Sequence, residues 1–307
     1  MPELPEVQTV VNDLNRKVKG RRITGVWFDW PKLIKDPYDQ YGGVKRRKIA
    51  HKHVAVFGKL LKGERIISVR RRGKSILVYL TGDKLLLIHQ KMTGHMLVGK
   101  WQIVNGNKIK PLGTGPITTD PYNQYIHLII YLDNGKMLAL SDLRKFAKAI
   151  LGTTAEIENL PELANLGPDA LDPKLDLKKF AEILTGERRK IKQALMDPYV
   201  IAGIGNIYSD DILWTAKIHP FRMTNKLTAG ELKNLWLAMR SVLKKAVRLR
   251  GTSTSDFRDT AGLEGGYTDY RLVYQREGQP CVRCKTKIKR VKLGGRSAHF
   301  CPRCQTL

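Results

Sequence analysis

The sequence has few cysteines and no long apolar run, and each shortage excludes a class of protein. Four cysteines in 307 residues are too few for a disulfide-rich secreted scaffold. No stretch approaches the roughly 18 apolar residues of a membrane span, and Glu3 and Glu6 interrupt the start, where a signal peptide needs basic and then apolar residues. With 42% hydrophobic residues, the chain is expected to be a globular cytoplasmic protein, long enough for two domains of ordinary size.

Acidic residues are also scarce relative to basic ones. The chain has 28 Asp and Glu against 55 Lys and Arg, which gives a net charge of +27. Such an excess points to a polyanionic partner, above all a nucleic acid. An anionic membrane is the weaker alternative, because no long basic amphipathic helix carries Trp and Leu on its apolar face. A thermophilic or salt-adapted surface would add charges of both signs.

The four cysteines are concentrated in the last 27 residues. They form two CxxC pairs, Cys281 with Cys284 and Cys301 with Cys304, separated by 16 residues. Two such pairs supply the four thiolates of a tetrahedral zinc site. Disulfides are the alternative, but the cytosol would keep them reduced. We therefore expect one structural zinc ion, with no open coordination position for catalysis.

The segment between the two pairs predicts a basic β-hairpin. Gly294 and Gly295 mark its turn, and such a small module needs its metal to fold. Its many cations suit it to phosphate, and they are Lys285, Lys287, Lys289, Arg290, Lys292 and Arg296.

The first half of the chain follows a strand pattern after one predicted helix. Apolar residues from Val7 to Val18 recur at helical spacing, and Pro5 suits a first turn. Strands are then expected at 76–80, 85–89, 96–98, 126–132 and 136–140, with Asp133-Asn134-Gly135 as a hairpin turn. Residues 101–124, rich in Gly and Pro, are expected to form a long surface loop.

From about residue 155 the period becomes helical. Asp176 predicts the start of a helix that Gly186 ends, and two more helices are expected over 190–196 and 206–217. Thr228 and Glu231 form a capping box for the longest helix, whose apolar stripe is interpreted as core. Residues 252–269 have no period and are expected to be a loop that is either disordered or able to move as a lid.

Three motifs in order resemble the formamidopyrimidine-DNA glycosylase family. They are Pro2-Glu3-Leu4-Pro5-Glu6-Val7, the stretch 197–220 with Gly203-Ile204-Gly205-Asn206-Ile207-Tyr208, and the CxxC-x16-CxxC pattern. The resemblance covers nearly the whole chain. It implies an α+β multidomain fold: an N-terminal β-sandwich with flanking helices (1–150), a helical helix-two-turn-helix domain with the lesion-capping loop (151–270) and a C-terminal zinc-finger β-hairpin (271–307).

The resemblance implies a bifunctional enzyme of base-excision repair that removes oxidised purines from DNA and then cuts the backbone. Its nucleophile would be the secondary amine of Pro2 after loss of Met1, and Glu3 would be the general acid. An α-amine titrates near pH 8, so part of it is neutral and able to attack the sugar C1′. An exposed tail would be the simpler interpretation of a Pro-Glu start considered alone.

Further residues match the family's DNA contacts. Lys74 matches the lysine that contacts the backbone and assists elimination, and Arg296 the arginine linked to the second elimination. Asn206, at a helix start, and Lys192 resemble phosphate contacts. Met92, Arg144 and Phe146 match the trio in which Met and Phe wedge into the base stack and Arg addresses the estranged cytosine. The loop 252–269 resembles the one that closes over extruded 8-oxoguanine.

The sequence departs from the family pattern in several places. The segment between Trp30 and His51, with Lys45-Arg46-Arg47-Lys48, is longer than usual. Asp211 replaces an expected Glu, Lys145 an Arg, Ala147 a Gly, and Tyr125 a phosphate-contacting His. The last substitution puts one DNA contact in doubt.

Two alternatives remain open at this level. An enzyme like endonuclease VIII would act on oxidised pyrimidines, although that group has Gly at the position of Leu4 and generally lacks the trio. A non-catalytic zinc-containing DNA-binding protein would share the charge and the zinc hairpin without needing Pro2 and Glu3. The expected partner is double-stranded DNA with oxidised bases or abasic sites, bound by a monomer without membrane association.

Overall fold

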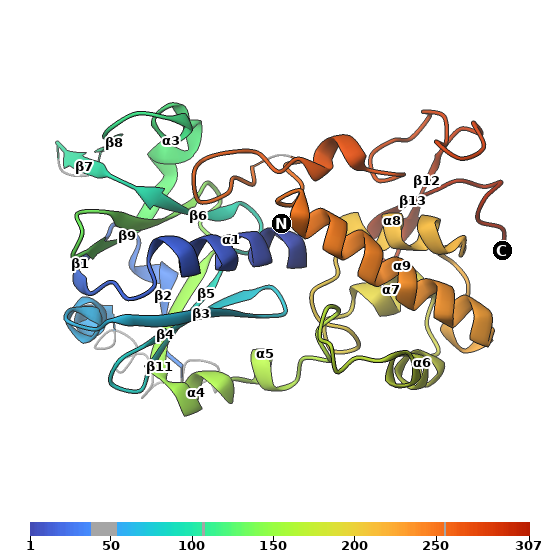
Figure 1. Ribbon diagram of the computed structural model, residues 1–307, viewed down its shortest axis with the longest axis horizontal. Coiled ribbons are helices and arrows are strands. Elements are labelled where there is room, and N and C mark those ends of the chain that lie inside the picture. Colours follow the sequence, from blue (N-terminus) through green and yellow to red (C-terminus); the bar gives the residue numbers. More distant parts are fainter. Residues whose placement is uncertain (38–53, 106–107, 255) are drawn as a thin grey trace. The chain divides into compact units, whose positions relative to one another are not determined.

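The computed structural model describes residues 1–37, 54–105, 108–254 and 256–307 (Figure 1). The basic run Lys45-Arg46-Arg47-Lys48 therefore lies outside the described residues. The chain forms two compact units. The first comprises Met1–Pro2, Glu6–Ala164 and Thr252–Gly265, and the second comprises Glu3–Pro5, Asn165–Gly251 and Gly266–Leu307.

The first unit contains two antiparallel-rich sheets. One has the strand order β1-β9-β10-β6, and its strands are β1 (Ile23–Phe28), β6 (Gly94–Gly99), β9 (Ile126–Leu132) and β10 (Met137–Asp142). The other has the order β2-β11-β5-β4-β3, and its strands are β2 (Ile34–Lys35), β3 (Ile66–Arg72), β4 (Ser75–Leu80), β5 (Lys84–His89) and β11 (Lys148–Thr153). The strand predictions for this half are thus confirmed, with ends shifted by one or two residues.

The core of this unit takes side chains from both sheets and from helix α1 (Leu4–Lys17). Val7, Val10 and Leu14 of α1 are fully buried with Ile76 of β4 and Leu128 of β9. The helical spacing of the apolar residues in α1 therefore marks the face that closes the core. Short helices complete the unit: η1 (Pro31–Leu33), residues 54–61, α4 (Thr154–Glu158) and α5 (Pro161–Ala164).

The prediction of a long surface loop over residues 101–124 is wrong. The segment contains a hairpin of β7 (Trp101–Val104) and β8 (Lys108–Pro111), followed by α3 (Pro116–Thr119) and η3 (Pro121–Tyr125). Trp101 is buried beside Ile126 and Ile129, and its indole N–H donates to Asn123 Oδ1 at 2.7 Å. The glycines and prolines that suggested a loop therefore punctuate short elements around a buried tryptophan.

The second unit is helical and carries the zinc hairpin. Its helices are α6 (Leu177–Thr185), α7 (Ile191–Met196), α8 (Asn206–Ala216), η4 (Thr224–Lys226), α9 (Ala229–Arg248) and η5 (Tyr267–Tyr270), and its strands are β12 (Lys289–Leu293) and β13 (Arg296–Phe300). The predicted caps are confirmed: Asp176 accepts a hydrogen bond from the Lys179 N–H, and Thr228 and Glu231 form the capping box of α9. The apolar stripe of α9 packs into the core of this unit.

Residues Thr252–Gly265 group with the first unit, where they contact α1 and β6. The Thr252 N–H donates to Glu6 Oε1 at 2.7 Å, and the Thr260 hydroxyl donates to Asp13 Oδ2 at 2.8 Å. The Val98 N–H donates to the Thr260 carbonyl at 2.9 Å. The described part of this loop is therefore held by specific hydrogen bonds, although it has no regular secondary structure before η5.

Candidate functional site

The predicted site residues divide between the two units. Pro2, Lys74, Met92, Arg144 and Phe146 belong to the first unit. The second unit holds the remaining predicted residues, which are Glu3, Lys192, Asn206, Arg296 and the four cysteines. In the second unit the start of α8 brings Glu3 and Asn206 together, and in the first unit the loops that carry Met92, Arg144 and Phe146 are hydrogen-bonded to each other.

In the second unit, the Glu3 carboxylate is fixed at the beginning of α8. It is 2% exposed and accepts hydrogen bonds from the Gly205 N–H at 2.7 Å and the Ile207 N–H at 2.9 Å, with the Tyr208 N–H at 3.5 Å. These N–H groups lack partners within the helix, and the helix dipole favours negative charge there. The start of α8 thus positions a carboxylate supplied by the N-terminal segment.

The glycines of the GIGN motif make this arrangement possible. A Cβ at Gly205 would lie 2.4 Å from the carboxyl carbon of Glu3, closer than any real contact. Gly203 has φ +109° and would place a Cβ 2.7 Å from the Leu4 side chain, while the Leu4 N–H donates to its carbonyl at 3.0 Å. Both glycines therefore allow residues 3 and 4 to approach the backbone.

Lys192 has a different environment from that of the predicted phosphate contact. Its side chain is fully buried, its ammonium forms an ion pair with Asp210, and it donates to the Ser297 carbonyl at 2.8 Å. Asp210 also accepts from the N–H and the ring Nδ1 of His299 at 2.9 Å each. Burial lowers the pKa of Lys192, and Asp210 opposes this shift. Lys192 connects α7, α8 and β13, and this geometry does not favour a phosphate contact.

Asn206 and Arg296 have environments that suit a polar ligand. Asn206 is the first residue of α8, and its buried side-chain oxygen has no hydrogen-bond partner among the residues that the structure describes. Arg296 opens β13 directly after the Gly294-Gly295 turn, and it is exposed. The two residues lie on elements joined by the Lys192–Asp210–His299 cluster.

In the first unit, the trio residues lie on two loops that are hydrogen-bonded to each other. The Thr93 hydroxyl donates to Asp142, and the Arg144 N–H donates to the Thr93 hydroxyl at 3.1 Å. Asp142 also accepts from the Ala147 N–H at 2.6 Å. This buried network joins the loop after β5, which carries Met92, to the loop after β10.

The second of these loops presents an aromatic side chain and a cation outward. Phe146 is 52% exposed, and the Arg144 guanidinium lies over its ring at 4.6 Å from the centroid. A single exposed apolar side chain is common on protein surfaces, so the cation over the ring is the more specific feature of this loop. The arrangement suits insertion between stacked bases, with the arginine beside it.

Pro2 and Lys74 lie in the same unit as the trio. Pro2 is buried whereas Met1 is exposed, and Lys74 follows Gly73 at the turn between β3 and β4. His89 pairs with Ser75, the residue after Lys74, across β4 and β5. Its ring Nδ1 accepts a hydrogen bond from the Lys91 N–H at 3.0 Å. Burial, reinforced by Lys91, lowers the pKa of His89 to about 3, so its ring is neutral at physiological pH.

The four cysteine sulfurs fit a tetrahedral metal. All four lie within 4.8 Å of one another, with Cys281 and Cys304 at 4.0 Å and Cys284 and Cys301 at 3.4 Å. Sulfurs bound to zinc at 2.3 Å lie about 3.8 Å apart. The Trp214 indole N–H donates to Cys281 Sγ at 3.4 Å, so α8 contacts the metal site directly. The cluster is a structural zinc site.

Asp211 attaches residues 267–280, the linker that precedes the zinc hairpin, to α8. It is fully buried and accepts from the Tyr267 hydroxyl at 3.0 Å and from the N–H groups of Leu272 and Val273 at 3.1 and 2.9 Å. Burial raises the pKa of its carboxyl, which these hydrogen bonds oppose. Sequence reasoning noticed Asp211 only as a substitution and missed Asp142 and Asp210, because nothing in a sequence distinguishes a buried aspartate from an exposed one.

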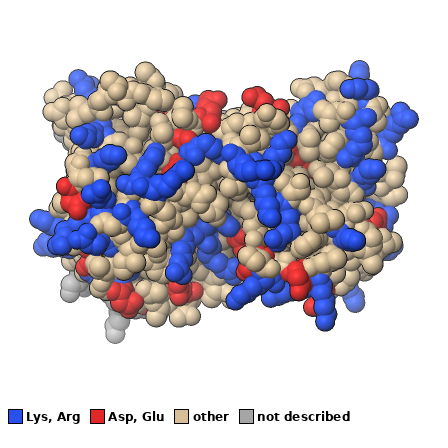
Figure 2. Space-filling model, viewed as in Figure 1, with Lys and Arg blue, Asp and Glu red and all other residues tan. Residues whose placement is uncertain are grey.

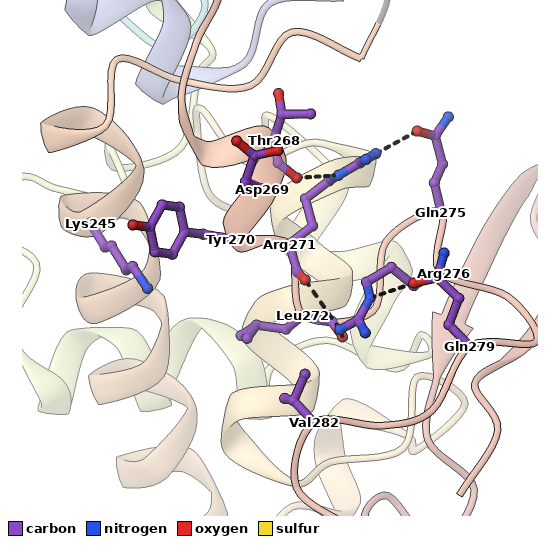
Figure 3. A pocket seen from close by; sticks show the side chains of 10 residues that line it. All are labelled: Lys245, Thr268, Asp269, Tyr270, Arg271, Leu272, Gln275, Arg276, Gln279 and Val282. Atoms are coloured by element: carbon purple, nitrogen blue, oxygen red, sulfur yellow. Dashed lines mark hydrogen bonds between the residues drawn. The ribbon is translucent and has the colours of Figure 1, made fainter. Parts of the chain in front are cut away.

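A pocket of about 450 Å³ lies between α9 and this linker (Figure 3). Its arginines are engaged by the chain: Arg276 donates to the Leu272 and Pro280 carbonyls, and Arg271 donates to the Thr268 carbonyl and to Gln275. Lys245 lies over the Tyr270 ring at 4.4 Å from the centroid. This pocket holds none of the predicted site residues, and its cations stabilise the linker.

The surface charge agrees with the composition. Figure 2 shows more Lys and Arg than Asp and Glu on the face in view. In the part of the chain that the structure describes, no helix combines the length and the apolar character needed to cross a bilayer.

Family models cover most of the chain. Residues 1–149 match the formamidopyrimidine-DNA glycosylase N-terminal domain, residues 166–258 its H2TH domain, and residues 278–307 the zinc finger found in FPG and IleRS. The formamidopyrimidine-DNA glycosylase of Pelotomaculum thermopropionicum is 35% identical over 305 residues, 99% of each chain. The enzyme of Symbiobacterium thermophilum is 39% identical over 99% of this chain and 89% of its own.

Solved structures with the same fold contain DNA. The Lactococcus lactis Fpg bound to DNA with an abasic site has a TM-score of 0.81 at 28% identity, covering 99% of this chain and 100% of that one. A variant of that protein with Fapy-dG DNA has a TM-score of 0.80 at 29% identity, and the wild type with oxidised-pyrimidine DNA 0.79 at 29%; each covers 100% of both chains. The matches do not favour the endonuclease VIII-like or the non-catalytic alternative.

Proposed function

This chain belongs to the formamidopyrimidine-DNA glycosylase family, and from that premise we propose how its residues excise a damaged base. The observation that carries the proposal is the Glu3 carboxylate, fixed by N–H groups at the start of α8 directly after Pro2 in the chain. The substrates are oxidised purines in double-stranded DNA, 8-oxoguanine opposite cytosine and formamidopyrimidines, together with abasic sites.

Pro2 is the nucleophile once Met1 has been removed. Its amine attacks C1′ and forms a C–N bond while the bond from C1′ to the base breaks. Glu3 acts as the general acid and donates a proton to the sugar ring oxygen. The sugar ring then opens, and an iminium links Pro2 to C1′. Loss of the proton at C2′ then expels the 3′ phosphate, and a second elimination expels the 5′ phosphate.

Cations and backbone N–H groups hold the DNA during these steps. Lys74 in the first unit, and Asn206 and Arg296 in the second, contact phosphates that flank the lesion. Met92 and Phe146 fill the space left by the extruded base, and Arg144 pairs with the estranged cytosine. The structural zinc supplies no chemistry; it stabilises the hairpin that carries Arg296.

The test is covalent trapping. Borohydride reduction of the protein with a duplex that contains 8-oxoguanine opposite cytosine should attach DNA to the N-terminal peptide lacking Met1, as measured by intact mass and peptide mapping. Pro2→Gly and Glu3→Gln should abolish or greatly weaken the adduct. Pro5→Ala is the matched control, because it removes a neighbouring proline and leaves the N-terminal amine, and it should still be trapped.

A parallel duplex with an oxidised pyrimidine measures lesion preference. Stronger trapping with that duplex would contradict the proposed preference for purines. Tight binding without an adduct on either duplex, with Met1 removed, would contradict the enzymatic proposal altogether.

A further inference from the structure

A cavity in the first unit combines an aromatic ring with an excess of positive charge. It has a volume of about 480 Å³ in the chain that retains Met1, and Met1 and Trp30 both lie in its wall. Lysines from three segments line it: Lys32 and Lys35, Lys91, and Lys145. No Asp or Glu lines it, and in the described structure none of these lysines forms an ion pair with a carboxylate. The cavity therefore suits an anion that also has an apolar, flat part.

Trp30 is the flat surface of this cavity. Its ring is partly buried, and it packs against the core of the first unit. The Lys145 ammonium lies 4.6 Å from the ring centroid, and the Lys32 ammonium lies 5.4 Å from it. A cation over a partly exposed indole is held only weakly, so a ligand that stacks on the ring and pairs with the ammonium groups can displace both lysines. An aromatic platform with mobile cations is what single-stranded nucleic acid binds.

The cavity adjoins the residues proposed to enter the base stack. Met92, Phe146 and Ala147 line it, and Ala147 directly precedes β11 in the chain. Lys145 has a left-handed backbone with φ +57° and is flanked by Arg144 and Phe146. The same turn therefore directs Arg144 over Phe146 and Lys145 over Trp30.

We propose that Trp30 and the lysines around it form a nucleotide subsite beside Met92 and Phe146, the two side chains proposed to enter the base stack. It takes one unstacked nucleotide of the strand that carries the estranged base, with the base on the indole face and its phosphate between Lys32 and Lys145. The strand is chosen because Arg144, the residue proposed to pair with the estranged base, precedes Lys145 on one turn. This inference rests on the proposed function.

The subsite supplies stacking that wedge insertion removes. Inserting Met92 and Phe146 separates neighbouring bases, which costs their stacking free energy. A base that stacks on Trp30 recovers part of that cost, since stacking on an aromatic side chain stabilises an unpaired base. Trp30 therefore acts as a positioning residue that favours the open duplex.

The experiment uses a duplex with a tetrahydrofuran abasic analogue opposite cytosine, which the enzyme cannot process. 2-Aminopurine replaces the base on either side of that cytosine in turn, and its emission reports stacking. Wild type should quench one of the two probes relative to the same probe in Trp30→Ala, and Trp30→Ala should bind the duplex about tenfold more weakly, or worse. Trp30→Phe keeps an aromatic face and should restore affinity to within about threefold of wild type.

Matched controls separate this subsite from general electrostatics and from folding. Lys145→Ala should weaken binding and reduce the quenching, whereas Lys110→Ala, which removes an exposed lysine of β8, should not change the quenching. Thermal unfolding identifies variants that lose structure, and Trp30→Phe tests the subsite if Trp30→Ala is destabilised.

Unchanged affinity and unchanged 2-aminopurine emission in folded Trp30 variants would overturn the subsite and leave Trp30 as core packing. The proposed function is tested separately by borohydride trapping of wild type. Failure of that trapping would contradict the enzymatic proposal. Normal trapping together with unchanged affinity and emission in the Trp30 variants would contradict only the subsite.

Discussion

At the scale of single residues, the site depends on a glycine at position 205, where a side chain would not fit. Gly205 has φ −135°, an ordinary extended conformation that any residue adopts. Glycine is therefore required at position 205 because of the space available, and not because of its backbone conformation. The backbone of Gly205 must approach the Glu3 carboxylate closely enough for its N–H to donate to it.

Gly205→Ala should abolish most activity while leaving the fold intact. The added Cβ would lie 2.4 Å from Glu3 and displace the carboxylate, and loss of a positioned acid–base group typically costs 10²–10⁴-fold in rate. Single-turnover cleavage of an 8-oxoguanine duplex measures the effect.

Gly230→Ala is the control for this substitution, because the nearest atom to its Cβ would be Thr228 Oγ1 at 3.9 Å. It should keep full activity, since Ala also favours the helix. Comparable activity in the two variants would contradict the assigned role of Gly205.

His89 makes stability depend on pH. Its pKa is about 3 in the folded protein and about 6.5 in an unfolded chain, so the unfolded state binds the proton more readily. The neutral ring of His89 therefore contributes to the free energy of unfolding above about pH 6.5, and this contribution is lost as the pH falls toward 3.

His89→Asn removes the titration and can keep an acceptor for the Lys91 N–H. The free energy of unfolding, measured with urea at pH 7 and pH 4.5, should fall less on acidification in this variant than in wild type. An equal decrease in the free energy of unfolding in both proteins would show that His89 does not cause the pH dependence.

At the scale of elements, a buried ion pair joins α7, α8 and the zinc hairpin. Lys192→Met leaves Asp210 with one fewer buried partner, and breaking such a pair typically costs 3–5 kcal/mol. We expect a large drop in the free energy of unfolding, measured with urea.

The same variant distinguishes a structural lysine from a phosphate contact. If Lys192 is structural, the slope of log binding constant against log salt concentration should stay as in wild type, whereas a lost phosphate contact lowers its magnitude by about 1. A slope of lower magnitude in the variant would support the predicted phosphate contact of Lys192.

Zinc removal should release the hairpin from α8. Because Trp214 donates to Cys281 and Cys281 belongs to the metal cluster, a chelator should change tryptophan emission together with loss of DNA cleavage. Both signals should return on addition of zinc. Retained cleavage after verified zinc loss would contradict a structural role for the metal.

At the scale of the whole molecule, the net charge of +27 predicts binding that depends steeply on salt. Each phosphate neutralised contributes about −0.9 to the slope of log binding constant against log salt for duplex DNA. Lys289→Ala and Lys292→Ala, in the exposed face of β12, should each reduce the slope by about 1. Lys178→Ala, on the exposed surface of α6, is the charge-matched control and should have no such effect.

The sequence by itself determined the features that local chemistry encodes. Caps, turns and period identified α6, α8, α9 and the strands β4, β5, β6, β9 and β10, because a capping side chain or an alternating pattern acts on its neighbours in sequence. The CxxC spacing identified the zinc ligands in the same way. The failure at 101–124 arose because Trp101 is buried by residues distant in sequence.

Only the tertiary structure decided what the buried charged groups do. Lys192, Asp210 and Asp211 look in the sequence like surface residues of helices, yet all are buried and hydrogen-bonded to partners from 18 to 105 positions away. The cavity at Trp30 likewise depends on three separated segments. Long-range packing sets the environment of a charge, and that environment decides whether the charge binds a ligand or holds the fold together.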